Sequence, residues 1–158
     1  MPVVIDVNVG IVANGKSEQA DIPCQLACID ALSAAQNDLV CIDAGDAILK
    51  EFRQNLSMSG QPGVGDEFML WLHQNQCVPE RCERVSIHVH ADRGYEEFPD
   101  DPQLSKFDRS DRKYVAVALT SHHKPTIINA TDPDWKEHQT ALKTHGVRIR
   151  NLCPQCLQ

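Results

Sequence analysis

Acidic side chains stand beside the apolar segments of this sequence at places that suit a metal site. Asp6 ends the first apolar run and Asp132 follows a late one, while Asp111 begins a helix-forming stretch and Glu51 lies within another. Carboxylates gathered in one place repel one another, which raises their pKa values and lowers stability unless a cation neutralises them. These four acids therefore predict a site for Mg²⁺ or Mn²⁺, cations that prefer oxygen ligands.

Hydrolysis of a phosphodiester is the chemistry that such a site would serve. A bound divalent cation can lower the pKa of a water molecule and orient it in line with the scissile bond. Two ions about 3.5 to 4 Å apart can also stabilise both the attacking and the leaving oxygen. The same residues could instead cap helices and form turns, because acids after strands commonly do so.

Further polar residues border these acids. Asn8 either positions water or phosphate in the site, or bonds to Asp6 or closes an Asx-turn. Asp134 is a further candidate metal ligand, although Asp132 follows the preceding apolar run more closely. Asp108 is expected to cap a helix rather than bind metal. The basic residues expected to steady a nucleic-acid backbone at this edge are Lys16, Arg109, Arg112 and Lys113.

The elements that must position these residues alternate between strand and helix patterns. Strands are expected at residues 3–7, 39–42, 85–89, 126–130 and 147–152. Helices are expected at 24–35 and 46–56, after a turn-rich break at 57–65 in the stretch that carries Phe68 to Leu72, at 114–119 behind an acid-capped start at 108–111, and at 133–144. Residues 93–106 lack either period and predict a solvated loop. This alternation predicts one α/β domain over residues 1–158, with a mostly parallel sheet between two helical layers and ligands beyond the carboxyl ends of the strands. Residues 76–106 form a long insertion or loop, and 153–158 a C-terminal tail.

The composition restricts the function further. The 158 residues carry a formal charge of -7, which argues against non-specific coating of DNA, because such binding depends on Lys and Arg neutralising phosphates. A metal-dependent nuclease remains compatible, since bound cations reverse the local charge. The sequence has no apolar stretch near the roughly 20 residues of a membrane span and no signal-peptide pattern at its start. A cytoplasmic location without membrane contact is expected.

The cysteines allow two interpretations. Their number is seven, and several lie in apolar segments, which favours reduced, buried thiols over a disulfide framework. Cys153 and Cys156 have the spacing of half a zinc site, and Cys77 with Cys82 could supply the other half. The alternative is a pair of reduced surface thiols on a loose tail.

Four segments of the chain resemble the PIN-like nuclease family, and they occur in the family's order. They are VIDVNV at residues 4–9, ILKEF at 48–52, DRKYVAVA at 111–118 and IINATD at 127–132. The resemblance implies a flavodoxin-like α/β/α fold, a Mg²⁺ or Mn²⁺ cofactor and RNase activity. It further implies a toxin or defence effector with an inhibitory or regulatory protein partner, and RNA as a more probable substrate than DNA.

Two rival functions stay open on the sequence. One is a PIN-like module whose acids bind no metal and which docks a partner protein. The other is a Mg²⁺-dependent phosphatase with an aspartyl nucleophile, although its usual Asp-x-Asp pair is Asp6-Val7-Asn8 in this chain. A homodimer through Phe68, Trp71 and Leu72 is a further option, but such an amphipathic stripe is more often core.

Overall fold

A five-stranded parallel sheet forms the centre of the molecule, in the order β3-β2-β1-β6-β7. The computed structural model describes residues 1–157. The strands are β1 (Val3–Ile5), β2 (Val40–Asp43), β3 (Cys82–Val85), β6 (Thr126–Asn129) and β7 (Arg148–Asn151). All residues of β1 and β2 are buried, as expected for strands that are covered on both faces.

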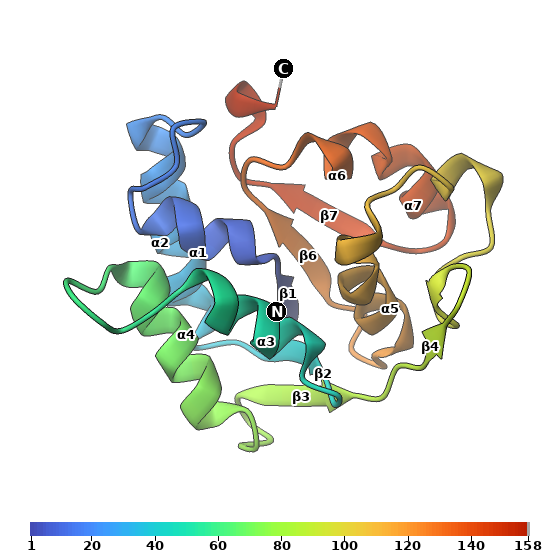
Figure 1. Ribbon diagram of the computed structural model, residues 1–158, viewed down its shortest axis with the longest axis horizontal. Helices are drawn as coiled ribbons and strands as arrows, with labels where there is room; N and C mark the ends of the chain where they lie inside the picture. Colours follow the sequence, from blue (N-terminus) through green and yellow to red (C-terminus); the bar gives the residue numbers. More distant parts are fainter. Residues whose placement is uncertain (158) are drawn as a thin grey trace.

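Helices cover both faces of this sheet, which confirms the expected three-layer α/β/α fold (Figure 1). One group comprises α1 (Val7–Ala13), α2 (Ile22–Ala35), α3 (Ala47–Asn55) and α4 (Val64–Asn75), which pack against one another. The other comprises α5 (Arg112–Thr120), α6 (Pro133–Glu137) and α7 (Gln139–Thr144). Within residues 1–157, no helix has both the length and the apolar character needed to cross a membrane.

Glycines allow α1 and α4 to pack closely in the first group. A Cβ atom at Gly65, in the first turn of α4, would collide with the main-chain carbonyl of Gly10 on α1. Because neither residue carries a side chain, the two helix backbones can approach each other directly. This contact fixes the start of α4 against the second half of α1.

The first strand is shorter than the sequence pattern suggested. The expected strand to Val7 is wrong beyond Ile5, because Asp6 turns the chain into α1. The Asp6 side chain accepts a hydrogen bond from the Asn8 N–H and so caps that helix. Val9 and Val12 of α1 are buried, so their apolar character reflects the core rather than a strand.

The insertion also differs from the expectation. Residues 85–89 do not form a strand, since β3 ends at Val85, and a small antiparallel ribbon follows as β4 (Val89–His90) and β5 (Gly94–Tyr95). Residues 93–106 are no solvated loop, because Phe98 and Leu104 are buried there. Three short 3-10 helices complete the described chain: η1 (Pro102–Leu104), η2 (Arg109–Asp111) and η3 (Pro154–Cys156). The helix expected at 133–144 is interrupted at His138 into α6 and α7.

Candidate metal centre

The acids lie where the two halves of the sheet diverge. β1 and β6 are neighbours, and the chain leads from β1 towards β2 and β3 but from β6 towards β7. Asp6 follows β1, and Asp132 follows β6, so both reach the carboxyl ends of adjacent central strands. In open α/β sheets this point of divergence forms the crevice where ligands bind.

Three carboxyl groups meet at this point. Asp6, Asp111 and Asp132 each offer an oxygen atom, and the three atoms lie within 4.8 Å of one another. Asp6 is 3% exposed and Asp111 7%, whereas Asp132 is half-buried and faces the solvent side. Oxygen ligands this close together suit a hard divalent cation.

Asp6 is held by two donors. Its Oδ1 atom accepts a hydrogen bond from the Asn8 N–H at 2.9 Å, and its Oδ2 atom accepts one from the Trp135 indole at 2.7 Å. Burial nevertheless raises the pKa of Asp6 to about 7, and the charges of Glu51 and Asp132 oppose its ionisation further. The two hydrogen bonds therefore fix the direction of the carboxylate without fully replacing its hydration.

Asp111 is more strongly perturbed. Its pKa is raised to about 9 by burial first, then by the charge of Asp6, by hydrogen bonding of its protonated form to Asp132 and by the charge of Asp132. Asp132 itself accepts a hydrogen bond at 2.9 Å from the N–H of Asp134 and so caps α6. A cation among these carboxyl groups would favour the ionised forms of Asp6 and Asp111 and so reverse both shifts, which is the behaviour expected of a divalent-metal site.

Glu51 borders this cluster and is not one of the three converging carboxyl groups. Its Oε1 atom accepts a hydrogen bond from the Tyr114 hydroxyl, and its Oε2 atom lies 3.2 Å from Lys113 Nζ. The Tyr114 hydroxyl also accepts a hydrogen bond from the Val7 N–H at 3.3 Å. Tyr114 thus connects the start of α1 with Glu51, and its own pKa is raised well above the usual value by burial and then by Asp6 and Glu51.

Sequence reasoning missed Tyr114 and Trp135. Each aromatic residue stands three positions after a cluster acid, Asp111 or Asp132, near the start of a helix. Residues three apart share a helix face, so each ring lies on the side of its helix that carries the acid. This repeated spacing of acid and aromatic was the signal available in the sequence.

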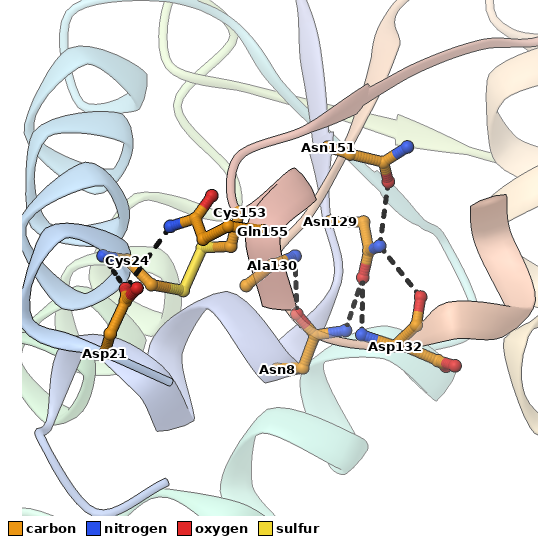
Figure 2. The surroundings of a disulfide bond; sticks show 9 residues. All are labelled: Asn8, Asp21, Cys24, Asn129, Ala130, Asp132, Asn151, Cys153 and Gln155. Carbon is orange, nitrogen blue, oxygen red and sulfur yellow. Dashed lines mark hydrogen bonds between the residues drawn. A yellow bond between two sulfur atoms is a disulfide. The ribbon is translucent and has the colours of Figure 1, made fainter. Parts of the chain in front are cut away.

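The side chain of Asn8 is hydrogen-bonded within the protein, and its predicted role of positioning water or phosphate stays a prediction. Its Nδ2 group donates to Asn129 Oδ1 at 2.9 Å, and its Oδ1 atom accepts from the Ala130 N–H at 2.9 Å (Figure 2). Asn129 in turn donates to Asn151 Oδ1 at 2.9 Å and to the Asp132 carbonyl at 3.0 Å. The side chain of Asn8 therefore fixes the loop that carries Asp132.

Asp134 is turned away from the cluster, so its assignment as a metal ligand there is corrected too. One of its carboxylate oxygens accepts from the Asp108 N–H at 2.8 Å, and the other lies 3.1 Å from His138 Nδ1. Asp108 accepts a hydrogen bond from the Ser110 N–H and caps η2, as expected of a capping residue.

Two of the basic residues expected to contact substrate are buried and bonded to other protein groups. The buried Arg112 guanidinium donates to the carbonyls of Leu104 and Phe107, among others, and lies 4.5 Å from the centre of the Phe98 ring. Lys113 is also buried, and its Nζ atom is bound by Glu51 and the Ser110 carbonyl. Neither cation is free to contact a phosphate, because leaving these partners would expose buried, unpaired groups.

The other two basic residues lie on the surface. Arg109 is exposed and donates to the carbonyls of Ala91 at 2.6 Å and Asp92 at 2.9 Å, which ties the insertion to η2. Lys16 is exposed, and its charge helps to lower the pKa of Asp66 rather than acting on the three acids. A hollow of about 480 Å³ lies beside Arg109 and Arg112, but its lining does not include the three acids.

The cysteine expectation is corrected as well. Cys24 and Cys153 form a disulfide, with Cα atoms 5.2 Å apart, so the thiols are not all reduced in this structure. The tail is not loose, since Cys153 and Leu157 are buried. Cys82 lies on β3, at the opposite sheet edge from β7 and the residues that follow it, so Cys77 and Cys82 do not complete a zinc site there.

Comparisons of the chain with protein-family models, with curated proteins and with solved structures gave no match.

Proposed function

We propose that this chain is a metal-dependent nuclease of the PIN-like type, which hydrolyses phosphodiester bonds in RNA. The observation that carries the proposal is the convergence of Asp6, Asp111 and Asp132 within 4.8 Å at the point where the sheet diverges. Burial of like charges lowers stability, and a site for Mg²⁺ or Mn²⁺ gives that arrangement a physical reason.

The bound cation would supply an activated water and a positive charge opposite the phosphate. The protein's own residues then have distinct tasks. Trp135 and the Asn8 N–H orient the Asp6 carboxylate, while the Asn8 side chain and Asn129 fix the loop of Asp132. Asp132 is the most accessible of the three acids and therefore faces the side from which a substrate enters.

Glu51 acts on the cation without binding it in this proposal. Its carboxylate is balanced by Lys113 and held by Tyr114, so its negative charge is fixed beside the cluster. A fixed negative charge there favours cation binding even where the carboxylate itself is not a ligand. Glu51 is thus assigned to metal affinity rather than to direct contact with the reacting water.

The rival functions fit the geometry less well. A module that only docks a partner has no use for two buried acids with raised pKa values. A phosphatase with a second acid after the first strand would need it at position 8, where Asn8 is bound on both sides. A cytoplasmic toxin or defence role, with an inhibitory protein partner, is proposed from the resemblance alone.

Cleavage of defined RNA tests the proposal. Single-stranded and hairpin oligoribonucleotides, and their DNA equivalents, would be incubated with the protein in EDTA, Mg²⁺ or Mn²⁺. We expect cation-dependent cleavage of RNA and a loss of about 100-fold or more in Asp132→Asn, since such a cluster contributes several kcal/mol to the transition state.

Asp134→Asn is the matched control. It makes the same chemical change two residues away but outside the cluster, and it should keep activity within a few-fold. Cation binding without cleavage of any oligonucleotide would contradict the nuclease and favour the docking module. An equal loss of cleavage activity in both variants would show that activity depends on the conformation of the loop and not on the Asp132 carboxylate.

A further inference from the structure

Four of the seven cysteines converge on one place, far more than one disulfide requires. Cys24 and Cys28 lie one turn apart on α2, both fully buried, and Cys153 reaches them from the segment after β7. The sulfur atoms of these three residues lie within 4.8 Å of one another. The sulfur of Cys156 also lies within 4.8 Å of that of Cys24.

The spacing of these cysteines is that of a structural zinc site. The first pair is separated by three residues and the second by two, and both separations fall in the range that zinc ligands use. Zinc-bound thiolates stand about 2.3 Å from the ion, which places tetrahedral sulfur atoms roughly 3.8 Å apart. The sulfur atoms of Cys24, Cys28 and Cys153 therefore need only small movements to surround an ion, whereas that of Cys156, within 4.8 Å of Cys24 alone, must turn towards the other two.

The surroundings hold both pairs in place. Asp21 caps α2 by accepting the Cys24 N–H at 2.8 Å, and its same oxygen accepts from Gln155 Nε2 at 3.3 Å (Figure 2). The Cys156 N–H donates to the Cys153 carbonyl at 2.9 Å, which closes the turn between the last two cysteines. Such outer contacts fix the ligands of metal sites before the metal binds.

We propose that the reduced chain binds one zinc ion through the thiolates of Cys24, Cys28, Cys153 and Cys156. The disulfide is then the oxidised form of the same site. A dithiol reductant gives two electrons and two protons to the Cys24–Cys153 bond and itself becomes a disulfide. Zn²⁺ next replaces one proton on each of the four thiols, which releases four protons to solvent and leaves a tetrathiolate centre.

Cobalt titration of the reduced protein tests this inference. Co²⁺ is the probe, because thiolate ligands give it intense charge-transfer bands and Zn²⁺ binds such sites more tightly. We expect one equivalent of Co²⁺ to give these bands in the reduced protein and one equivalent of Zn²⁺ to abolish them. The oxidised protein should give no such bands with Co²⁺. Reduced wild-type protein without such bands, and without zinc by elemental analysis, would overturn the proposal.

Variants identify the ligands. Cys28→Ser and Cys156→Ser both keep the Cys24–Cys153 disulfide, so their folding can be verified in the oxidised state before reduction. Each should bind Co²⁺ roughly tenfold or more weakly, whereas Cys41→Ser, a buried thiol on β2, should bind as wild type does. Unchanged binding in Cys28→Ser, or binding lost in Asp21→Asn but not in Cys156→Ser, would refute the four-cysteine site.

Discussion

Replacing Asp111 with Asn should stabilise the metal-free protein, although it removes a residue of the proposed metal site. The folded state holds this carboxyl group in its neutral form near pH 7, whereas the unfolded chain ionises it. Asn is neutral in both states and similar in shape. Its Nδ2 group can donate to Asp132, as a protonated Asp111 would.

The size of the effect follows from the pKa. Burial, Asp6 and Asp132 raise the pKa of Asp111 from 3.8 to about 9. Each pH unit between 3.8 and 7 contributes about 1.4 kcal/mol, which sets a ceiling of about 4 kcal/mol at pH 7. Because Asp6 shares the same proton equilibrium, we expect about 2 kcal/mol, or a rise in Tm of roughly 4 to 8 °C.

The sign of the pH dependence follows from the same shift. A raised pKa means that the folded protein keeps a proton which the unfolded chain releases. The stabilisation is therefore complete below about pH 4, and it is lost as the pH rises towards the folded pKa values of about 7 for Asp6 and 9 for Asp111. Metal-free wild-type protein should therefore lose stability between about pH 4 and pH 9, and Mg²⁺ or Mn²⁺ should restore it.

Thermal denaturation between pH 4 and 9, in EDTA and with Mg²⁺, measures these effects. Asp111→Asn should melt higher than wild type in EDTA at pH 7, depend less on pH and respond little to metal. Asp43→Asn is the control. The buried Asp43 carboxylate accepts hydrogen bonds from the N–H groups of Ala47 and Ile48 at 2.8 Å each. Losing one of these acceptors should lower the free energy of unfolding by about 1 to 2 kcal/mol. An Asp111→Asn protein that melts lower, as the control does, would refute the reasoning.

Two more predictions concern the supports of the site. Tyr114→Phe should lower the free energy of unfolding, measured in urea, by about 1 to 3 kcal/mol. The reason is that it leaves the Val7 N–H and a Glu51 oxygen without their hydrogen-bond partner. An unchanged urea midpoint would contradict this prediction. Arg112→Ala should cost about 3 kcal/mol and increase hydrogen exchange across residues 93–107, since it removes the donor to several buried carbonyls. Arg109→Ala, at the surface of the same segment, should change exchange far less.

The layered fold could be predicted from the sequence because apolar runs and helical periods alternate along it. Helix α2 and strands β2, β6 and β7 lie within two residues of their expected positions. Helix α1 could not be recognised from periodicity, since Val7, Val9 and Val12 continue the β-branched character of β1. The local capping bond from the Asn8 N–H to the Asp6 side chain marks the start of the helix.

The acids of the site could be predicted better than its basic residues. Asp6 and Asp132 follow neighbouring strands, so strand order alone brings them together. Arg112 and Lys113 look from the sequence like surface cations at a helix start, yet both are buried. Arg112 folds back onto the carbonyls of Leu104 and Phe107 in the irregular segment before its helix, and Lys113 pairs with Glu51 from a distant helix, so no local periodicity predicts either contact.

The C-terminal segment contacts the loop that carries Asp132 through a short series of hydrogen bonds. β7 ends at Asn151, two residues before Cys153, and the Asn151 side chain accepts a hydrogen bond from Asn129. Asn129 in turn donates to the carbonyl of Asp132, the most accessible acid of the cluster. A bond from Cys153 to α2, whether to sulfur or to a zinc ion, therefore fixes the end of β7 and, through Asn129, the loop that carries Asp132. The two proposed sites differ in ligand chemistry, since carboxylate oxygens suit Mg²⁺ or Mn²⁺ and thiolates suit Zn²⁺.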